Sequence, residues 1–202
     1  MDREVWFETL RRRVADFYLS DPADEFRQSG RSAGAERWFE TRHCLVEAID
    51  RSGHFMDIGC ANGLLLDTLI EWLGPDGLTI VPHGIDFVPE LIELARRRHP
   101  DHVDNFSVAN VWDWAPDRRY DYVRTNVEYV PDADRASNLR RLFDETVGPG
   151  GRLIVCHYVG GGNQTDDIAG LMRSVGLDVS GTTRADGVAV AWVDAPGRSA
   201  DS

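Results

Sequence analysis

The pattern of apolar positions changes character near residue 54. Before that point, apolar side chains recur at steps of three and four residues, at Val5, Leu10, Val14 and Phe17, between acidic and arginine neighbours. This spacing predicts a helix whose apolar residues share one face. After a Gly/Ser-rich break, a second helix is expected from about Ala35 to Asp50. Its residues expected to turn inward are Trp38, Phe39, Cys44, Leu45 and Ile49.

From residue 54 onward, short apolar runs alternate with helical patterns. The runs predict strands at 54–59, 78–86, 106–109, 120–125 and 152–157. The intervening patterns predict helices at 64–73, 90–98 and 134–147, with a Gly/Pro turn at 148–151 and a last helix from 168 that residues 165–167 cap. Strands that alternate with helices are typical of a parallel α/β sheet.

The end of the chain breaks this alternation. Two strand-like runs, 177–183 and 187–194, are joined by only three residues, which are too few for a crossover helix. They are therefore expected to pair antiparallel. The predicted fold is a Rossmann-like parallel sheet with a C-terminal antiparallel hairpin. We expect a helical cap or lid over residues 1–50, a core over 51–195 and a tail over 196–202.

Composition narrows the possible functions. The chain has 202 residues and a formal net charge of −12, and all its basic residues are arginine. The negative charge repels phosphate backbones and argues against nucleic-acid binding, and the absence of lysine excludes Schiff-base chemistry and a Walker A loop. No apolar run is long enough to span a membrane, and the start is not a signal peptide. The three cysteines share no metal-ligand spacing, so a reduced, cytoplasmic protein is expected.

The turn after the first predicted strand is the first candidate for ligand binding. Here the chain runs from Asp57 to Gly63 with the sequence DIGCANG. Gly59 would let a ligand approach the backbone, and Gly63 would open the next helix, whose free N–H groups face that ligand. The dinucleotide fingerprint G-x-G-x-x-G fails, because Ala61 and Leu64 occupy its second and third glycine positions. Taken alone, the loop is equally typical of an ordinary strand-to-helix turn.

The next three strand ends add polar groups at the same edge of the sheet. Asp86 ends the second strand, where a carboxylate can accept hydrogen bonds from both hydroxyls of a ribose. Asn110 follows the third strand, where its amide could contact the edge of an adenine. Asn126 ends the fourth strand, where the reacting end of a ligand would lie. Ligands of open parallel sheets bind at this edge.

At this point the chain resembles the class I S-adenosylmethionine-dependent methyltransferases over residues 50–194. The acid-x-Gly-x-x-x-Gly loop, its order relative to Asp86 and Asn110, and the terminal hairpin carry the resemblance. One departure is Ala61, where the family usually has a third glycine. The resemblance implies that S-adenosylmethionine is the methyl donor. The residues that it places around that donor are Asp57, Gly59, Cys60 and Gly63 at the methionine portion, Asp86 at the ribose, Asn110, Val111, Phe87 and Trp112 at the adenine, and Asn126 at the reacting end.

The loop after the fourth strand bears on the methyl acceptor. DNA amino-methyltransferases carry prolines there, whereas this chain has Asn126-Val127-Glu128-Tyr129. Catechol-type enzymes hold magnesium with acids at the fourth and fifth strand ends, where this chain offers Asn126 and Cys156-His157, a poor site for a hard cation. A small-molecule acceptor and no metal are therefore expected.

A general base is needed only when the acceptor is protonated. Tyr129 and His157 are the candidate catalytic residues, with Glu128 and Tyr158 nearby, and each also fits a structural role. Two other functions stay open: a cofactor-binding module without transfer activity and a nucleotide-dependent oxidoreductase. Residues 1–50 could be a mobile lid or two permanently docked helices.

Overall fold

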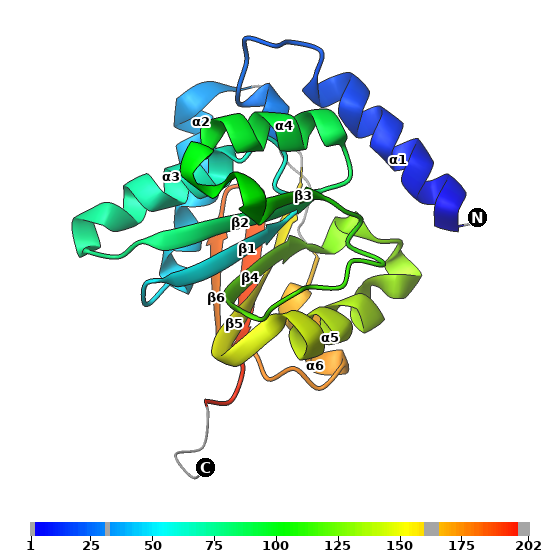
Figure 1. The fold of residues 1–202 in the computed structure, drawn as a ribbon. Coiled ribbons are helices and arrows are strands. Elements are labelled where there is room, and N and C mark those ends of the chain that lie inside the picture. The colour runs from blue at the N-terminus through cyan, green and yellow to red at the C-terminus, as the bar shows by residue number, and fades with distance from the viewer. Residues whose placement is uncertain (1–2, 31–32, 160–165, 198–202) are drawn as a thin grey trace.

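Seven strands form one sheet in the computed structural model, which describes residues 3–30, 33–159 and 166–197 (Figure 1). The strands lie in the order β3-β2-β1-β4-β5-β7-β6. Strands β1 to β5 are all parallel to one another. Strand β7 runs antiparallel to both of its neighbours, β5 and β6. The expected parallel sheet with a terminal antiparallel hairpin is confirmed. The bounds of the strands are β1 Gly53–Ile58, β2 Ile80–Asp86, β3 Phe106–Val108, β4 Tyr120–Asn126, β5 Val147–Tyr158, β6 Gly181–Ala185 and β7 Val188–Asp194.

The helices begin and end at local signals that the sequence carries. Gly63, with φ +77°, precedes α3, and Pro89 opens α4, where its missing N–H costs nothing. Asp167 caps α6 by accepting a hydrogen bond from the Gly170 N–H, whereas the expected cap residue Thr165 lies outside the described residues. The bounds of the helices are α1 Arg3–Tyr18, α2 Gly34–Arg42, α3 Leu64–Leu73, α4 Pro89–Arg98, α5 Arg135–Thr146 and α6 Ile168–Ser174.

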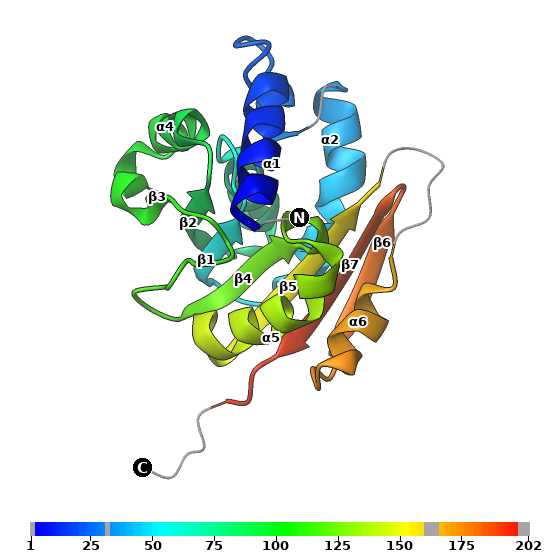
Figure 2. The same cartoon turned by 90° about the vertical axis from the view of Figure 1, so that its right-hand side faces the viewer.

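Helices cover both faces of the sheet. On one face α3 contributes Leu66 and Leu69, which are fully buried in a cluster that also takes in Ile92 of α4. On the other face Leu142 of α5 and Met172 of α6 are fully buried against the sheet. Figure 2 shows α5 and α6 in the lower part of the molecule and α1 and α2 at its upper end. Two separate apolar layers therefore hold the strands in place.

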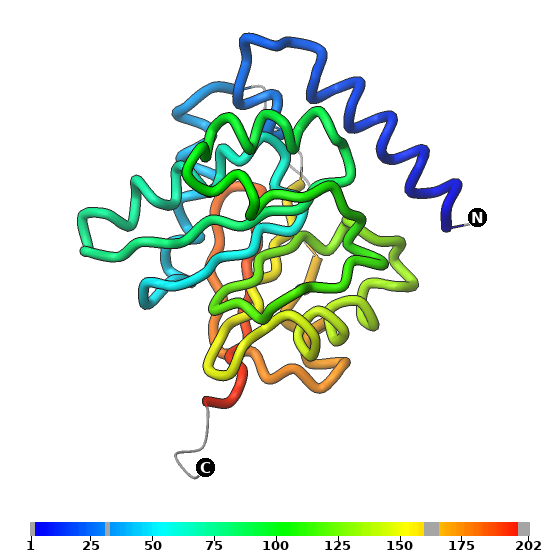
Figure 3. The backbone as a smooth tube through the Cα atoms, in the orientation of Figure 1, coloured from blue at the N-terminus to red at the C-terminus, as the bar shows by residue number. Residues whose placement is uncertain are grey.

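The carboxyl ends of the parallel strands meet at one edge of the sheet, and the N-terminal segment crosses that edge. The backbone trace shows the chain running from α1 across the upper end of the molecule before it descends into β1 (Figure 3). Helix α1 brings Phe7 into the same core cluster as α5 and α6. The N-terminal segment is therefore packed against the sheet edge where ligands of such folds bind.

The helix expected over 35–50 is shorter than predicted. Helix α2 ends at Arg42, and a 3₁₀ helix, His43–Ala48, follows it. Leu45 and Ala48 are both fully buried three residues apart, the spacing that a 3₁₀ turn aligns. The prediction that Phe39 turns inward was wrong, since its side chain is 48% exposed while the adjacent Trp38 occupies the buried side of α2.

The glycine-rich turn expected at 148–151 was also wrong. These residues belong to the start of β5, which begins at Val147. The Gly150 N–H bonds to the carbonyl of Pro196 at 2.9 Å, and the Ala195 N–H bonds to the carbonyl of Gly151 at 2.8 Å. Hydrogen bonds to Ala195 and Pro196, far along the chain, therefore hold this segment as a strand, although its local composition is typical of a turn. The terminal hairpin turns at Asp186-Gly187, where Gly187 has φ +68°.

Candidate functional site

A cavity of about 350 Å³ opens at the carboxyl ends of β1, β2, β4 and β5. Its wall combines the loop after β1, the ends of β2 and β4, the residues after β3, and side chains of α1 and α2. The predicted site residues that it brings together are Asp57, Gly59, Cys60, Asp86, Phe87, Asn110, Val111, Asn126 and Tyr129. Gly63, Trp112 and His157 are not part of this wall.

The loop after β1 is held in a conformation that suits close approach to its backbone. The Gly59 and Cys60 N–H groups both bond to the Ile85 carbonyl, at 2.8 and 3.0 Å. Gly59 has φ +77°, and a Cβ there would lie 2.5 Å from the Tyr129 ring. Ala61 has φ +49°, the left-handed region that favours glycine. The alanine therefore keeps the backbone that a glycine would adopt at this position.

Asp86 connects the end of β2 to that loop. One carboxylate oxygen accepts the Ala61 N–H at 3.0 Å, and the other accepts the Val88 N–H at 2.9 Å. Only 5% of the residue is exposed, and burial raises the pKa of Asp86 to about 6 although the backbone hydrogen bonds oppose the rise. Each oxygen retains capacity to accept one more hydrogen bond. A diol in the cavity could therefore donate to both oxygens of a fixed carboxylate.

The residues after β3 form the far wall. Asn110 accepts the Trp112 N–H at 3.1 Å through its side-chain oxygen, which fixes a tight turn, and Val111 is 7% exposed. Trp112 turns away from the cavity and lies under the Arg3 guanidinium of α1, 3.5 Å from the ring centroid. Phe87 contacts both the cavity and the groove beneath α1. This end of the cavity is thus lined mainly by apolar side chains beside one amide.

Two residues of the loop have structural surroundings. The carbonyl of Gly63 lies 3.1 Å from His99 Nε2, and a Cβ on Gly63 would lie 3.3 Å from the Ala95 backbone, so this glycine allows α3 and α4 to approach. The Cys60 side chain packs against Gly84 of β2. Burial raises the pKa of the Cys60 thiol well above its usual value, so the thiol stays protonated.

An ion pair that the sequence did not predict lies at the base of the cavity. Arg124 of β4 donates to Asp57 of β1 at 2.9 Å, and their side chains are 5% and 1% exposed. Burial raises the pKa of Asp57, and the neighbouring guanidinium opposes that rise. The strand register sets Asp57 beside Arg124, a pairing that sequence spacing alone does not reveal. The one signal in the sequence was an arginine inside a predicted strand.

The N-terminal segment supplies one side of the cavity. Phe7, Leu10, Val14 and Tyr18 line it from one face of α1, and Trp38 and Arg42 line it from α2. Arg42 lies between two aromatic rings, 4.6 Å from the Trp38 centroid and 4.4 Å from that of Tyr158. Arg31, which precedes α2 in the sequence, lies outside the described residues. The cavity is therefore a space between the sheet edge and the first two helices.

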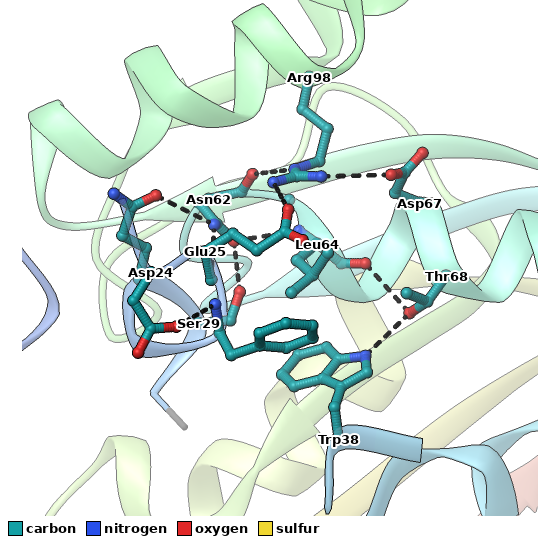
Figure 4. Close-up of polar contacts among 12 residues, drawn as sticks. Asp24, Glu25, Ser29, Trp38, Asn62, Leu64, Asp67, Thr68 and Arg98 are labelled. Carbon is teal, nitrogen blue, oxygen red and sulfur yellow. Dashed lines mark hydrogen bonds and ion pairs between the residues drawn. The ribbon is translucent and has the colours of Figure 1, made fainter. Parts of the chain in front are cut away.

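Polar contacts attach α2 and the connection between α1 and α2 to the rest of the chain (Figure 4). Their partners lie in the loop after β1, in α3 and in α4. Asn62 donates to the Glu25 carbonyl at 3.0 Å, and Ser29 donates to the Asn62 side chain. Arg98 of α4 reaches the Glu25 carboxylate at 2.8 Å, while Trp38 donates to Thr68 of α3 at 3.3 Å. We call this group of contacts the latch. It joins the segment above the cavity to the loop that forms its floor.

The two candidate catalytic residues lie in different surroundings. The Tyr129 hydroxyl donates to the Gly59 carbonyl at 3.4 Å, and burial raises the pKa of Tyr129 well above its usual value. His157 is the second-to-last residue of β5, where its Nδ1 accepts the Asp166 N–H at 2.8 Å beside α6. Tyr129 is thus a neutral hydroxyl on the cavity wall, and His157 holds the segment that leads into α6.

Two residues that line the cavity each carry a buried polar atom with no hydrogen-bond partner within the part of the chain that the structure describes. These atoms are Arg124 Nε and Glu128 Oε2. Native proteins rarely leave such atoms unpaired, so their grouping around one cavity indicates a place where a polar ligand binds. Among the described residues, no group of three His, Cys, Asp or Glu side chains is placed to hold a metal ion. No described helix is long and apolar enough to cross a membrane.

Comparisons with known proteins agree with this geometry. A family model described as a methyltransferase domain matches residues 23–169. The fold is similar to a putative methyltransferase of Haloferax volcanii solved in complex with the Trm112 methyltransferase activator, with a TM-score of 0.61 and 17% identity over 81% of this chain and 92% of that one. No curated protein matches the sequence.

Two further similar structures carry the word O-methyltransferase in their descriptions. The mitomycin 7-O-methyltransferase MmcR has a TM-score of 0.62 and 17% identity over 90% of this chain and 60% of that one. NcsB1, from neocarzinostatin biosynthesis, was solved with S-adenosyl-L-homocysteine and 1,4-dihydroxy-2-naphthoic acid. Its TM-score is 0.60, at 18% identity over 79% of this chain and 55% of that one. At these identities the likeness shows a shared fold.

Proposed function

The chain belongs to the methyltransferase domain family and is an S-adenosylmethionine-dependent methyltransferase, and we propose that it methylates a small molecule without a metal ion. The observation that carries the small-molecule acceptor is the cavity of about 350 Å³ between the sheet edge and the first two helices. Its size is in the range of small-molecule sites. The net charge of −12 opposes binding of a nucleic acid. The O-methyltransferase descriptions of two structural neighbours favour the same class of acceptor.

We propose that the donor extends across the floor of the cavity. Asp86 would hold the ribose hydroxyls, Asn110 and Val111 would contact the adenine, and the loop from Gly59 to Ala61 would meet the methionine portion. The unpaired Arg124 Nε–H supports a hydrogen-bond acceptor near this end. The donor supplies a methyl group on a sulfonium that is already activated. The chain's own residues have to hold the acceptor in line with that methyl and exclude water.

Loss of the Asp86 carboxylate is expected to weaken binding of S-adenosylhomocysteine, the demethylated donor, at least about tenfold, since each charge-assisted hydrogen bond contributes about 1.5–3 kcal/mol. Titration calorimetry of Asp86→Ala measures the loss. Because Asp86 also accepts backbone hydrogen bonds, thermal unfolding checks the fold. The matched control is a 2′,3′-dideoxy form of the ligand, for which wild type and variant should differ little. An equal loss of affinity for both ligands would show that Asp86 does not bind the ribose hydroxyls.

The N-terminal segment is proposed to act as a lid, with residues 1–50 forming a cap separate from the core over 51–195. The latch and the α1 side chains that line the cavity support closure over the donor. Amides between residues 20 and 40 are therefore expected to gain protection from hydrogen exchange when S-adenosylhomocysteine binds. Equal protection in the free and bound protein would instead favour two permanently docked helices.

A transfer assay tests the proposed function. The protein is incubated with S-adenosylmethionine carrying a labelled methyl group, a panel of small-molecule alcohols, phenols and amines, and EDTA. Label is expected in a small-molecule product, and EDTA is expected to leave the rate unchanged. Loss of the rate with EDTA would overturn the metal-independent mechanism. Tight binding of S-adenosylhomocysteine without transfer to the panel would favour a binding module, and binding of NADH in its place would favour an oxidoreductase.

A further inference from the structure

A buried chain of hydrogen bonds runs along one face of β4 and ends at the cavity. Arg124 and Asn126 lie two residues apart in the strand, so their side chains share a face. Arg124 binds Asp57 through one nitrogen and donates to the Asn126 side-chain oxygen through another. The Asn126 amide in turn donates to Glu128 Oε1 at 3.1 Å. Each member therefore fixes the next, from the end of β1 to Glu128.

The second oxygen of Glu128 is the free end of this chain. Glu128 Oε2 is buried and has no hydrogen-bond partner among the described residues, and the residue lines the cavity. A carboxylate that is held through one oxygen and has no partner at the other retains the capacity to accept a proton or a hydrogen bond. This is the arrangement that a positioned proton acceptor requires.

The charges around Glu128 suit that role. Burial raises the pKa of Glu128 to about 7, against the opposing effects of its own backbone N–H, of Arg124 on β4, of Arg135 on α5 and of the Asn126 hydrogen bond. Tyr18, whose pKa is raised to about 12, faces it from α1 as a neutral hydroxyl. A group with a pKa near 7 is about half ionised at neutral pH, where a general base is most effective.

Other groups on the wall are less suited to take a proton. Burial raises the pKa values of Tyr129 and Tyr158, so both phenols stay protonated, and a neutral phenol is a poor proton acceptor. His157 is outside the cavity wall and accepts a backbone hydrogen bond through Nδ1. Of the four candidates after the fourth and fifth strands, Glu128 alone combines a cavity position with a free proton-accepting atom.

We propose that Glu128 is the general base of the methyl transfer and that the acceptor is a hydroxyl compound, an alcohol or a phenol. This inference rests on the proposed function. The acceptor must bring a proton on its nucleophile, because otherwise Glu128 has no proton to accept. A hydroxyl is favoured over an amine because a hydroxyl oxygen becomes a good nucleophile only as it loses its proton, whereas a neutral amine already carries a free lone pair.

The step balances in atoms and charge. A lone pair of the hydroxyl oxygen forms the new C–O bond while the C–S bond breaks, and the sulfur keeps that electron pair. The hydroxyl proton passes to Glu128 Oε2. The positive sulfonium and the negative carboxylate both become neutral, and the proton leaves to solvent after the products dissociate. Asn126 and Arg124 are positioning residues, since they act through Glu128.

The first test titrates Glu128 directly and needs no acceptor. Glutamate carboxyl carbons are labelled with ¹³C, and the Glu128 signal is assigned by its absence from Glu128→Gln. The titration is recorded for the free protein, with S-adenosylhomocysteine, and with sinefungin, in which a carbon bearing an ammonium group replaces the methyl sulfonium. Sinefungin is expected to lower the pKa of Glu128 by about one unit or more relative to S-adenosylhomocysteine, because a cation then lies beside the carboxylate.

The outcomes of this titration separate the two proposals. Binding of both ligands with no difference in the Glu128 titration would overturn the assignment of Glu128 and leave the donor site standing. Binding of neither ligand would instead overturn the proposed function.

The second test uses the acceptor that the transfer assay identifies. Glu128→Gln is expected to lower the transfer rate about 10²- to 10³-fold while its affinity for S-adenosylhomocysteine stays within about twofold of wild type. The wild-type rate should rise with pH through about 7 as Glu128 loses its proton, whereas the variant should lack this rise. Glu145→Gln, which removes the same charge from an exposed ion pair with Arg141, is the matched control and should match wild type.

Two results of the second test would overturn the inference. If Glu128→Gln lost as much affinity for S-adenosylhomocysteine as transfer rate, Glu128 would be a residue that binds the methyl donor and not a general base. Transfer to amines and to no hydroxyl compound would overturn the acceptor class.

Discussion

Valine at position 59 is expected to abolish binding of S-adenosylhomocysteine, with a loss in affinity of at least about a hundredfold, or about 2.8 kcal/mol. Gly59 has φ +77°, a conformation that a β-branched residue adopts only with strain, and a Cβ there would lie 2.5 Å from the Tyr129 ring. The added carbons would also occupy the path by which the donor reaches the backbone of the loop. Titration calorimetry of Gly59→Val measures the loss.

Two matched variants separate the blocked path from general damage. Gly77→Val places the same side chain at φ +71° with no atom within 4 Å, far from the cavity wall, so it should lower stability and leave the affinity unchanged. Cys60→Ser alters the adjacent side chain, whose thiol is protonated, and should bind about as well as wild type. Wild-type affinity in Gly59→Val would show that the donor does not approach this loop.

Removing the Arg124 guanidinium is expected to destabilise the fold by about 3–5 kcal/mol, because it leaves the Asp57 carboxylate buried and unpaired. Asp57 is 1% exposed and lies 2.9 Å from Arg124, so its carboxylate would lose its ion-pair partner at a place with very little solvent contact. The measurement is urea unfolding of Arg124→Met at neutral pH. Arg140→Met, which breaks an exposed ion pair with Asp144, is the matched control and should shift the midpoint little.

The pH dependence of that loss has a definite sign. Burial raises the pKa of Asp57, and the effect becomes larger when Arg124 no longer opposes it. The penalty of Arg124→Met is therefore full above that pKa and shrinks as the pH falls through it, because the neutral acid is tolerated in the interior. Adding Asp57→Asn should recover much of the lost stability. A loss no greater than that of Arg140→Met would contradict a buried, paired charge.

Most of the sheet and its helices could be predicted because their signals are local. Gly63 and Pro89 mark helix starts by backbone conformation, and the short link between the last two strands leaves only an antiparallel pairing. The turn at 148–151 could not be read correctly, because its hydrogen-bond partners, Ala195 and Pro196, lie far along the chain. Phe39 and Trp38 are adjacent in α2, and the composition does not say which of the two is buried.

The residues of the candidate site likewise include some that the sequence predicts and some that only the structure reveals. The positions of Gly59, Asp86 and Asn110 follow from chain order, because parallel strands bring their carboxyl ends to one edge. Arg124 was missed because its role depends on the register between β1 and β4, which places it beside Asp57. The free oxygen of Glu128 likewise depends on tertiary packing. Sequence order thus indicates where a ligand binds, and the chemistry at the reacting end requires the three-dimensional structure.

A crystal structure of the protein with S-adenosylhomocysteine would locate the donor directly. We expect that both ribose hydroxyls donate to the Asp86 carboxylate, that the adenine lies against Val111, and that the sulfur lies at the end of the cavity where Glu128 Oε2 has no partner. S-Adenosylhomocysteine bound with its ribose away from Asp86, or absent from the cavity in crystals grown at saturating ligand, would contradict this expectation.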